Sequence, residues 1–265
     1  MSDLHQLAEI ADQAVQIGHD LMKGGKPATA AEKTERDWVT DLDTRIEREI
    51  RAYLSDRTPE IGFLGEEEGA HDGTGSDRWI LDPIDGTANF MHGIPLCAVS
   101  LALVRDDRPL IGVITAPFLG MRYRAIEGHG AYGNGARLRC SDTTNLAHSI
   151  ISIGDYATGP SAAEKNVVRL RLTTLLAERV ERIRMLGSAA LDLAWVAEGR
   201  TTGTIILGAK PWDSAAGIII AREAGAIVVD ASGSYLNFES REALAANQHL
   251  IGLLTAFAQD ARSTD

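Results

Sequence analysis

Cysteine is scarce in this sequence. Cys97 and Cys140 are the only two among 265 residues, and their separation is not the spacing of a metal-binding motif. With so few cysteines, a reduced, cytoplasmic setting is the simplest expectation.

Basic charge and long apolar runs are lacking as well. The 26 Lys and Arg residues are outnumbered by 37 Asp and Glu, for a net charge of −11. This balance argues against a nucleic-acid partner, because such a partner requires a clustered basic face. Residues 1–22 carry acids without the basic and apolar regions of a signal peptide, and no apolar run approaches the length of a membrane span. We therefore expect no membrane association.

The hydrophobic residues that are present, 45% of the chain, suffice for one compact domain over residues 1–265. The pattern of residues 1–145 predicts helices and a largely antiparallel sheet, whereas residues 146–265 alternate between helical and strand patterns. We expect an α/β protein in which these two subdomains pack together.

The local patterns place the first elements along the chain. Helices are predicted over residues 4–22 and from Asp41 onward, with a polar loop over residues 24–37 between them. Short strands and hairpins follow, over residues 61–65, 79–82, 98–104, 110–117 and 121–139.

The stretch LDPIDGT, residues 81–87, combines groups that bind metals. Asp82 precedes Pro83, which pushes its backbone to an extended conformation and directs its carboxylate out from the strand end. Asp85 follows, and a turn here leaves the Ile84 carbonyl without a regular strand partner. Two carboxylates and a carbonyl are hard oxygen ligands suited to Mg²⁺.

The residues that follow suit a phosphate group. Gly86 lets the backbone approach a ligand closely, and Thr87 is predicted to open a short helix whose free N–H groups can hold phosphate. An ordinary strand, Asp-Pro turn and helix start would give the same seven residues, so the motif alone does not decide.

Further acids stand at element ends. Glu66, Glu67 and Glu68 follow an apolar strand, where a solvated turn is the ordinary explanation. Asp213 heads a helix and Asp43 lies early in another, where both fit helix caps. Each signal is weak when taken separately.

Taken together, these motifs resemble the inositol monophosphatase family of metal-dependent, lithium-sensitive phosphatases. The resemblance rests on GEE (65–67), WILDPIDGTANF (79–90) and PWDSAAG (211–217), with support from Lys33, DWVTDLD (37–43), GAYGNG (130–135) and GSAALDLAWVAEG (187–199). It implies an αβαβα sandwich, two or three Mg²⁺ ions and a homodimer.

The resemblance also implies roles for individual residues. Metal ligands would be Glu66, Asp82, Asp85, Asp213 and the Ile84 carbonyl. Thr87, Asp43 and Glu66 would orient the attacking water, and the Gly86 and Thr87 amides would hold phosphate. Lys33 would lie in a mobile loop, and the substrate's alcohol would contact Asp85, Gly187, Ser188, Ala189 and position 206.

The expected chemistry also follows from the charges. Several converging carboxylates repel one another, and Mg²⁺ ions remove that conflict while lowering the pKa of a bound water. Phosphoryl transfer needs positioning and charge neutralisation more than covalent help. We therefore expect direct attack by a metal-activated water on a small phosphomonoester, with release of inorganic phosphate.

Ile206 leaves the identity of the substrate undecided. Many inositol-hydrolysing relatives carry a glutamate here, whereas isoleucine cannot accept a hydroxyl hydrogen bond, and an unpaired polar group costs about 1–3 kcal/mol. The alternative is that Ile206 is a core strand residue and that a neighbour such as Lys210 binds the hydroxyl instead. Inositol phosphate, histidinol phosphate, a sugar phosphate or a nucleotide bisphosphate are alternatives, the last requiring basic groups such as Lys210 or residues 182–186.

Two other classes compete with this interpretation. Aspartyl-phosphate phosphatases also end a strand in two aspartates, but theirs are two residues apart, whereas Asp82 and Asp85 are three apart around Pro83. A partner-binding protein that keeps the fold is the alternative outside enzymes. Because every expected side-chain ligand is acidic, the sequence favours catalysis.

Overall fold

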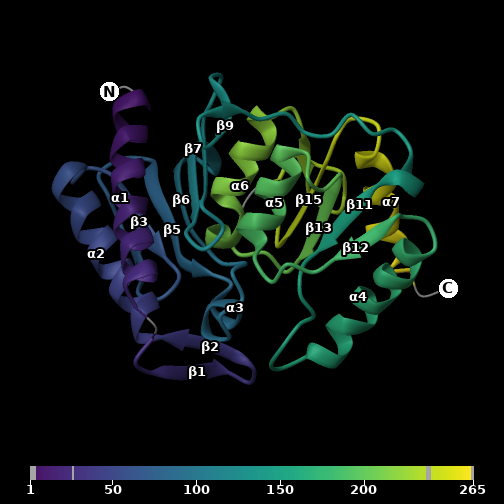
Figure 1. The fold of residues 1–265 in the computed structure, drawn as a ribbon, viewed down its shortest axis with the longest axis horizontal. Helices are drawn as coiled ribbons and strands as arrows, with labels where there is room; N and C mark the ends of the chain where they lie inside the picture. Colours follow the sequence, from purple (N-terminus) through teal and green to yellow (C-terminus); the bar gives the residue numbers. More distant parts are fainter. Residues whose placement is uncertain (1–3, 26, 237–239, 264–265) are drawn as a thin grey trace.

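The computed structural model describes residues 4–25, 27–236 and 240–263, which form helices and sheets stacked in layers (Figure 1). Helices α1 (Leu4–Gly24) and α2 (Asp41–Arg57) form the first layer, and their apolar faces pack on a large sheet. Both helices were predicted, and α1 repeats apolar residues at the spacing that buries one helix face.

The large sheet has eight strands in the order β10-β9-β8-β7-β6-β5-β3-β4. All neighbours are antiparallel except β3 and β5, which are parallel. Its strands are β3 (Gly62–Gly65), β4 (Gly69–His71), β5 (Asp77–Asp85), β6 (Ala98–Arg105), β7 (Arg108–Ala116), β8 (Met121–Ile126), β9 (Gly130–Gly133) and β10 (Ala136–Arg137). The antiparallel first half predicted from the sequence is confirmed.

The second sheet has five strands in the order β12-β11-β13-β15-β14. Strand β11 runs parallel to β12 and β13, whereas β15 runs antiparallel to both of its neighbours. Its strands are β11 (Ile150–Ile153), β12 (Arg182–Arg184), β13 (Gly203–Leu207), β14 (Ile227–Val229) and β15 (Glu242–Ala246).

Two helices, α5 (Ala189–Glu198) and α6 (Pro211–Glu223), lie between the sheets (Figure 1). Both are almost wholly buried, because they contact a sheet on each side. Helices α4 (Ala162–Ala177) and α7 (Ile251–Asp260) cover the outer face of the second sheet. The layers therefore read α, β, α, β, α, and the predicted sandwich is confirmed. The division at residue 145 stays a prediction.

The chain between α1 and α2 differs from the predicted polar loop. Part of it forms a hairpin of β1 (Ala30–Thr34) and β2 (Asp37–Thr40), whose turn includes Arg36 with a positive φ of 62°. All five residues of β1 are exposed, so the stretch has none of the apolar alternation by which strands are recognised. The hairpin brings Lys33 and Trp38 to the edge of the site described next.

Candidate active site

Strand β5 is the element around which the site forms. It is buried over Trp79–Asp85 and extends past Pro83, three residues beyond the predicted end. Its pairing with β6 is regular as far as Asp82 and shifts between Asp82 and Asp85. Proline has no N–H to donate to the hydrogen-bond ladder between strands, so it is tolerated where the ladder is interrupted by a bulge. The Ile84 carbonyl is thereby free of the ladder and lies 3.0 Å from the Thr87 hydroxyl, whose single proton is shared between this carbonyl and Asp43 Oδ1.

Gly86 makes the turn from β5 into the short helix α3 (Thr87–Met91). Its φ is +89°, and a Cβ at this position would lie 2.9 Å from the carbonyl oxygens of Gly187 and Leu96. Only glycine satisfies both conditions. No side chain caps α3, so its first N–H groups lack a side-chain acceptor.

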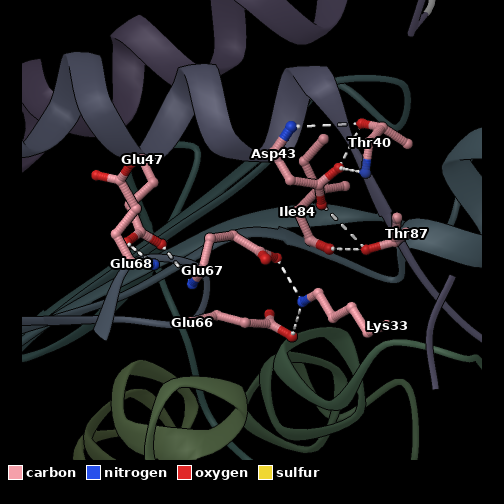
Figure 2. A network of polar contacts seen from close by, with 9 residues as sticks. All are labelled: Lys33, Thr40, Asp43, Glu47, Glu66, Glu67, Glu68, Ile84 and Thr87. Carbon is pink, nitrogen blue, oxygen red and sulfur yellow. Dashed lines mark hydrogen bonds and ion pairs between the residues drawn. The ribbon is translucent and has the colours of Figure 1, made fainter. Parts of the chain in front are cut away.

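Asp43 is buried at the start of α2 and links that helix to α3. Its Oδ2 accepts the Thr40 N–H at 2.9 Å as part of a capping box, and its Oδ1 accepts the Thr87 hydroxyl at 3.1 Å. The predicted pairing of Asp43 with Thr87 is thus present (Figure 2).

Asp85 joins β5 to the N-terminus of α5. Its carboxylate accepts the N–H of Ala190 at 2.8 Å, the N–H of Ala189 at 3.2 Å and the hydroxyl of Ser188, which is the N-cap of α5. A helix N-terminus favours negative charge, so α5 stabilises Asp85 in its ionised form. Asn89 fixes the same segment by donating to the Leu186 carbonyl at 2.8 Å.

The three glutamates after β3 point to different partners. The Lys33 ammonium lies 3.0 Å from Glu66 Oε1 and 2.6 Å from Glu67 Oε1 (Figure 2). Glu68 turns away and pairs with Arg48 on α2 at 2.5 Å. The solvated turn considered from the sequence is therefore wrong for Glu66 and Glu67, whose side chains are largely covered.

Asp213 lies in the first turn of α6, as predicted. Its Oδ2 accepts the Lys210 N–H at 2.8 Å, and Pro211 begins the helix, where no N–H partner is needed. The Lys210 ammonium stacks on the Trp212 ring, 5.2 Å from its centroid.

One cavity of about 330 Å³ brings most of the predicted residues together. It is lined by Glu66, Asp82, Ile84, Asp85, Gly86, Thr87, Gly187, Ser188, Ala189, Ile206 and Asp213. Asp43 and Lys33 are not in its lining and reach it through Thr87 and Glu66.

The cavity has further walls that the sequence did not single out, among them Arg36, Asp155, Arg169 and Asp192. They come from the hairpin, the loop after β11, α4 and α5; Asp192 lies inside the GSAALDLAWVAEG stretch, whereas none of the motifs quoted above contains the other three. Neither Lys210 nor the arginines of residues 182–186 are part of the described lining, in which the basic residues are Arg36 and Arg169.

Burial raises the pKa of Asp82, Asp85 and Asp213 in the cavity. Asp82 is 2% exposed, and burial together with the charges of Glu66, Asp85 and Asp213 holds its pKa well above the usual range. Burial raises the pKa of Asp85, opposed by its hydrogen bond from Ser188, and raises the pKa of Asp213 to about 6. Four acids in one buried place favour either protonation or a bound cation.

The cavity's chemistry fits a divalent metal ion. Asp82 Oδ1 is buried without a hydrogen-bond partner, a costly condition that a cation would relieve. The other donors are carboxylates and the free Ile84 carbonyl, the oxygen ligands of Mg²⁺. Within the described ranges, no three His, Cys, Asp or Glu side chains are arranged to hold an ion as they stand.

A layered sandwich with carboxylates and an uncapped helix start in one cavity fits a metal-dependent phosphatase. Comparison with known proteins agrees. Residues 3–263 match the inositol monophosphatase family. An inositol-1-monophosphatase of Mesorhizobium japonicum is 43% identical over 213 residues, which are 80% of this chain and 79% of that protein.

Two further relatives cover the chain almost completely. A fructose-1,6-bisphosphatase/inositol-1-monophosphatase of Thermotoga maritima is 38% identical over 88% of this chain and 87% of its own. The crystal structure of the extragenic suppressor protein suhB from Bartonella henselae superposes with a TM-score of 0.89 at 34% identity, over 96% of this chain and 98% of that one. The chain belongs to the inositol monophosphatase family, whose members are metal-dependent phosphomonoester hydrolases.

Proposed function

We propose that this protein is a Mg²⁺-dependent phosphatase that hydrolyses a small phosphorylated alcohol, inositol monophosphate or a compound of similar size. The observation that carries this proposal is the cavity in which Asp82, Asp85, Asp213 and Glu66 line one wall next to the uncapped start of α3. Such a cavity suits a dianionic phosphate only when cations neutralise its acids.

Glu66, Asp82, Asp85, Asp213 and the Ile84 carbonyl would hold two or three Mg²⁺ ions. When bound, the ions would neutralise the phosphate and lower the pKa of the attacking water. The Gly86 and Thr87 amides, at the start of α3, would bind phosphate oxygens.

Thr87 and Asp43 supply a path for a proton. The Thr87 hydroxyl donates toward Asp43 Oδ1, so its lone pairs are available to accept a hydrogen bond from a water in the cavity. Glu66 lines the same cavity and would accept a hydrogen bond from the other O–H of that water. The two groups together would orient the water for direct attack on phosphorus, with the alcohol leaving on the opposite side.

The alcohol side of the cavity sets the choice of substrate. Gly187, Ser188 and Ala189 form one wall, and Ile206, 5% exposed, provides an apolar surface in place of an acceptor. Arg169 lines the same cavity and donates its hydrogen bonds to carbonyl oxygens, not carboxylates, including Asp155 O at 3.2 Å. Its charge favours a second anionic group, and the Thermotoga maritima relative is named for a bisphosphate as well as a monophosphate.

A substrate panel tests the function. Phosphate release is measured with Mg²⁺, with and without Li⁺, on inositol 1-phosphate, histidinol phosphate, sugar phosphates and bisphosphates. We expect Mg²⁺-dependent, Li⁺-sensitive release, absent from the Asp82→Asn variant. A wild-type enzyme that binds Mg²⁺ and releases phosphate from none of these esters would contradict the proposal and favour the partner-binding alternative.

The cellular location and the oligomeric state of the protein are also part of the proposal. Among the described residues no helix is long and apolar enough to cross a membrane. A homodimer and a cytoplasmic location are the arrangements we propose, and sedimentation of the purified protein together with fractionation of its source cells would test them.

A further inference from the structure

Glu47 is a buried carboxylate that the phosphatase chemistry does not use. It lies on α2 with no exposed surface, and no Lys, Arg or His of the described chain forms an ion pair with it. A buried carboxylate without a cation is costly unless other groups donate hydrogen bonds to it, so the donors around Glu47 have to be identified.

Those donors are main-chain groups of the turn that carries Glu66. Glu47 Oε2 accepts the Glu67 N–H at 2.9 Å, and Oε1 accepts the Glu68 N–H at 2.8 Å. Figure 2 shows the Glu47 side chain reaching the backbone at Glu67 and Glu68 from α2. Both oxygens are therefore engaged, each by a different residue of one turn, and hydrogen bonds to a charged acceptor are stronger than neutral ones.

Gly65 makes room for this contact. A Cβ built at Gly65 would overlap both carboxylate oxygens of Glu47. The φ of Gly65 is not in the left-handed region, so the absence of a side chain here serves space and not backbone conformation. The Glu47 carboxylate therefore occupies the space that a side chain at position 65 would fill.

The same helix face also holds the other half of the proposed water site. Asp43 and Glu47 are four residues apart, which places them one above the other on α2. Asp43 binds Thr87, and Glu47 binds the turn after Glu66. Ile46 and Ile50, both fully buried, anchor α2 to the large sheet.

We propose that Glu47 is a positioning residue, which fixes Glu66 relative to Thr87 by holding the turn after β3 against α2. This inference rests on the proposed function, in which Glu66 and Thr87 act together. A displacement of about 1 Å in such a pair costs on the order of 100-fold in rate. Groups that support metal ligands contribute about 10–100-fold in affinity or activity.

Glu47→Gln is the direct test. The amide keeps the size of the side chain but replaces one acceptor oxygen with a donor, so one of the two N–H groups faces a donor. Glu49→Gln is the matched control, because it makes the same change on the exposed side of α2, where Glu49 pairs with Arg45. Three quantities are measured: amide hydrogen exchange at Glu67 and Glu68, calorimetric Mg²⁺ binding, and kcat and KM at saturating Mg²⁺.

We expect faster exchange at the two amides, Mg²⁺ affinity at least about 10-fold weaker and kcat lowered by about 10–100-fold, with KM for the ester within about twofold. Glu49→Gln should match the wild type in all three. A Glu47→Gln protein that loses thermal stability alone, with unchanged Mg²⁺ affinity and kcat, would overturn the proposal.

Two further outcomes are informative. If Glu47→Gln does not fold, Gly65→Ala displaces the same carboxylate and should give the same losses of Mg²⁺ affinity and kcat. If neither variant folds, the contact between Glu47 and the turn is required for folding, and the positioning role is overturned. If the wild type releases no phosphate, the proposed function fails separately, and unchanged exchange at Glu67 and Glu68 in Glu47→Gln would still reject the contact.

Discussion

Asp213 gives a quantitative prediction about stability without metal. Burial raises its pKa from the ordinary 3.8 to about 6 in the folded protein, despite the opposing hydrogen bond from Lys210. The folded state then binds more protons than the unfolded state between about pH 4 and pH 6. The stabilisation from that extra proton is complete below about pH 4 and is lost as the pH rises through about 6.

The magnitude follows from the size of this pKa change. A rise of about two pH units corresponds to about 3 kcal/mol. For 265 residues, with an unfolding entropy of about 2.1 cal/mol/K per residue, this amounts to about 5 °C in Tm. That is a large share of the 5–15 kcal/mol by which proteins are typically stable.

The assay is thermal unfolding of the wild type and Asp213→Asn in EDTA, from pH 4.5 to pH 8. Asparagine does not titrate, so the difference between the two proteins reports Asp213 together with the effect of its charge on Asp82 and Asp85. We expect the free energy of unfolding of the variant to rise relative to that of the wild type as the pH rises, by up to about 3 kcal/mol at pH 8. Mg²⁺ should reverse the order, because only the wild type keeps the full ligand set. A difference that stays constant or falls with pH would refute the reasoning.

Three other variants probe separate parts of the site. Asp82→Asn should lower kcat by orders of magnitude with little change in circular dichroism, and near-wild-type turnover would remove Asp82 from the metal site. Ile206→Glu should raise kcat/KM for inositol 1-phosphate relative to a sugar phosphate by roughly 5–150-fold, because a paired hydroxyl is worth about 1–3 kcal/mol. An unchanged ratio of the two kcat/KM values would show that position 206 does not contact the alcohol. Ser188→Ala should lower the unfolding free energy in denaturant by about 1–3 kcal/mol, because Asp85 loses a donor and α5 loses its N-cap; unchanged stability would contradict the contact.

The sequence predicted the parts of the site that are local in the chain. LDPIDGT carries its ligands and its glycine within seven residues, and the structure adds the bulge at Pro83 that frees the Ile84 carbonyl. Asp213 was recognisable because a proline and a helical pattern surround it. The α/β character followed from periodicity, since α1 and α2 are strongly one-sided and later elements alternate, whereas the αβαβα layering followed from the family resemblance.

What the sequence could not predict depends on tertiary contacts. The hairpin of β1 and β2 is exposed and polar, so its strands carry no hydrophobic pattern. Arg169 lines the cavity from a helix far from LDPIDGT, and nothing near it in the chain marks that position. Glu47 looks like an ordinary surface acid of α2, and only the space left by Gly65 shows its contact.

The central claim is that the acids of this cavity hold divalent metal. Anomalous scattering from crystals soaked in Mn²⁺, used as a heavier substitute for Mg²⁺, measures this directly. The account predicts peaks bounded by Asp82, Asp85, Asp213, Glu66 and the Ile84 carbonyl, and their loss in Asp82→Asn. Well-ordered crystals with no peak in the cavity, or with Mn²⁺ bound only elsewhere, would contradict it.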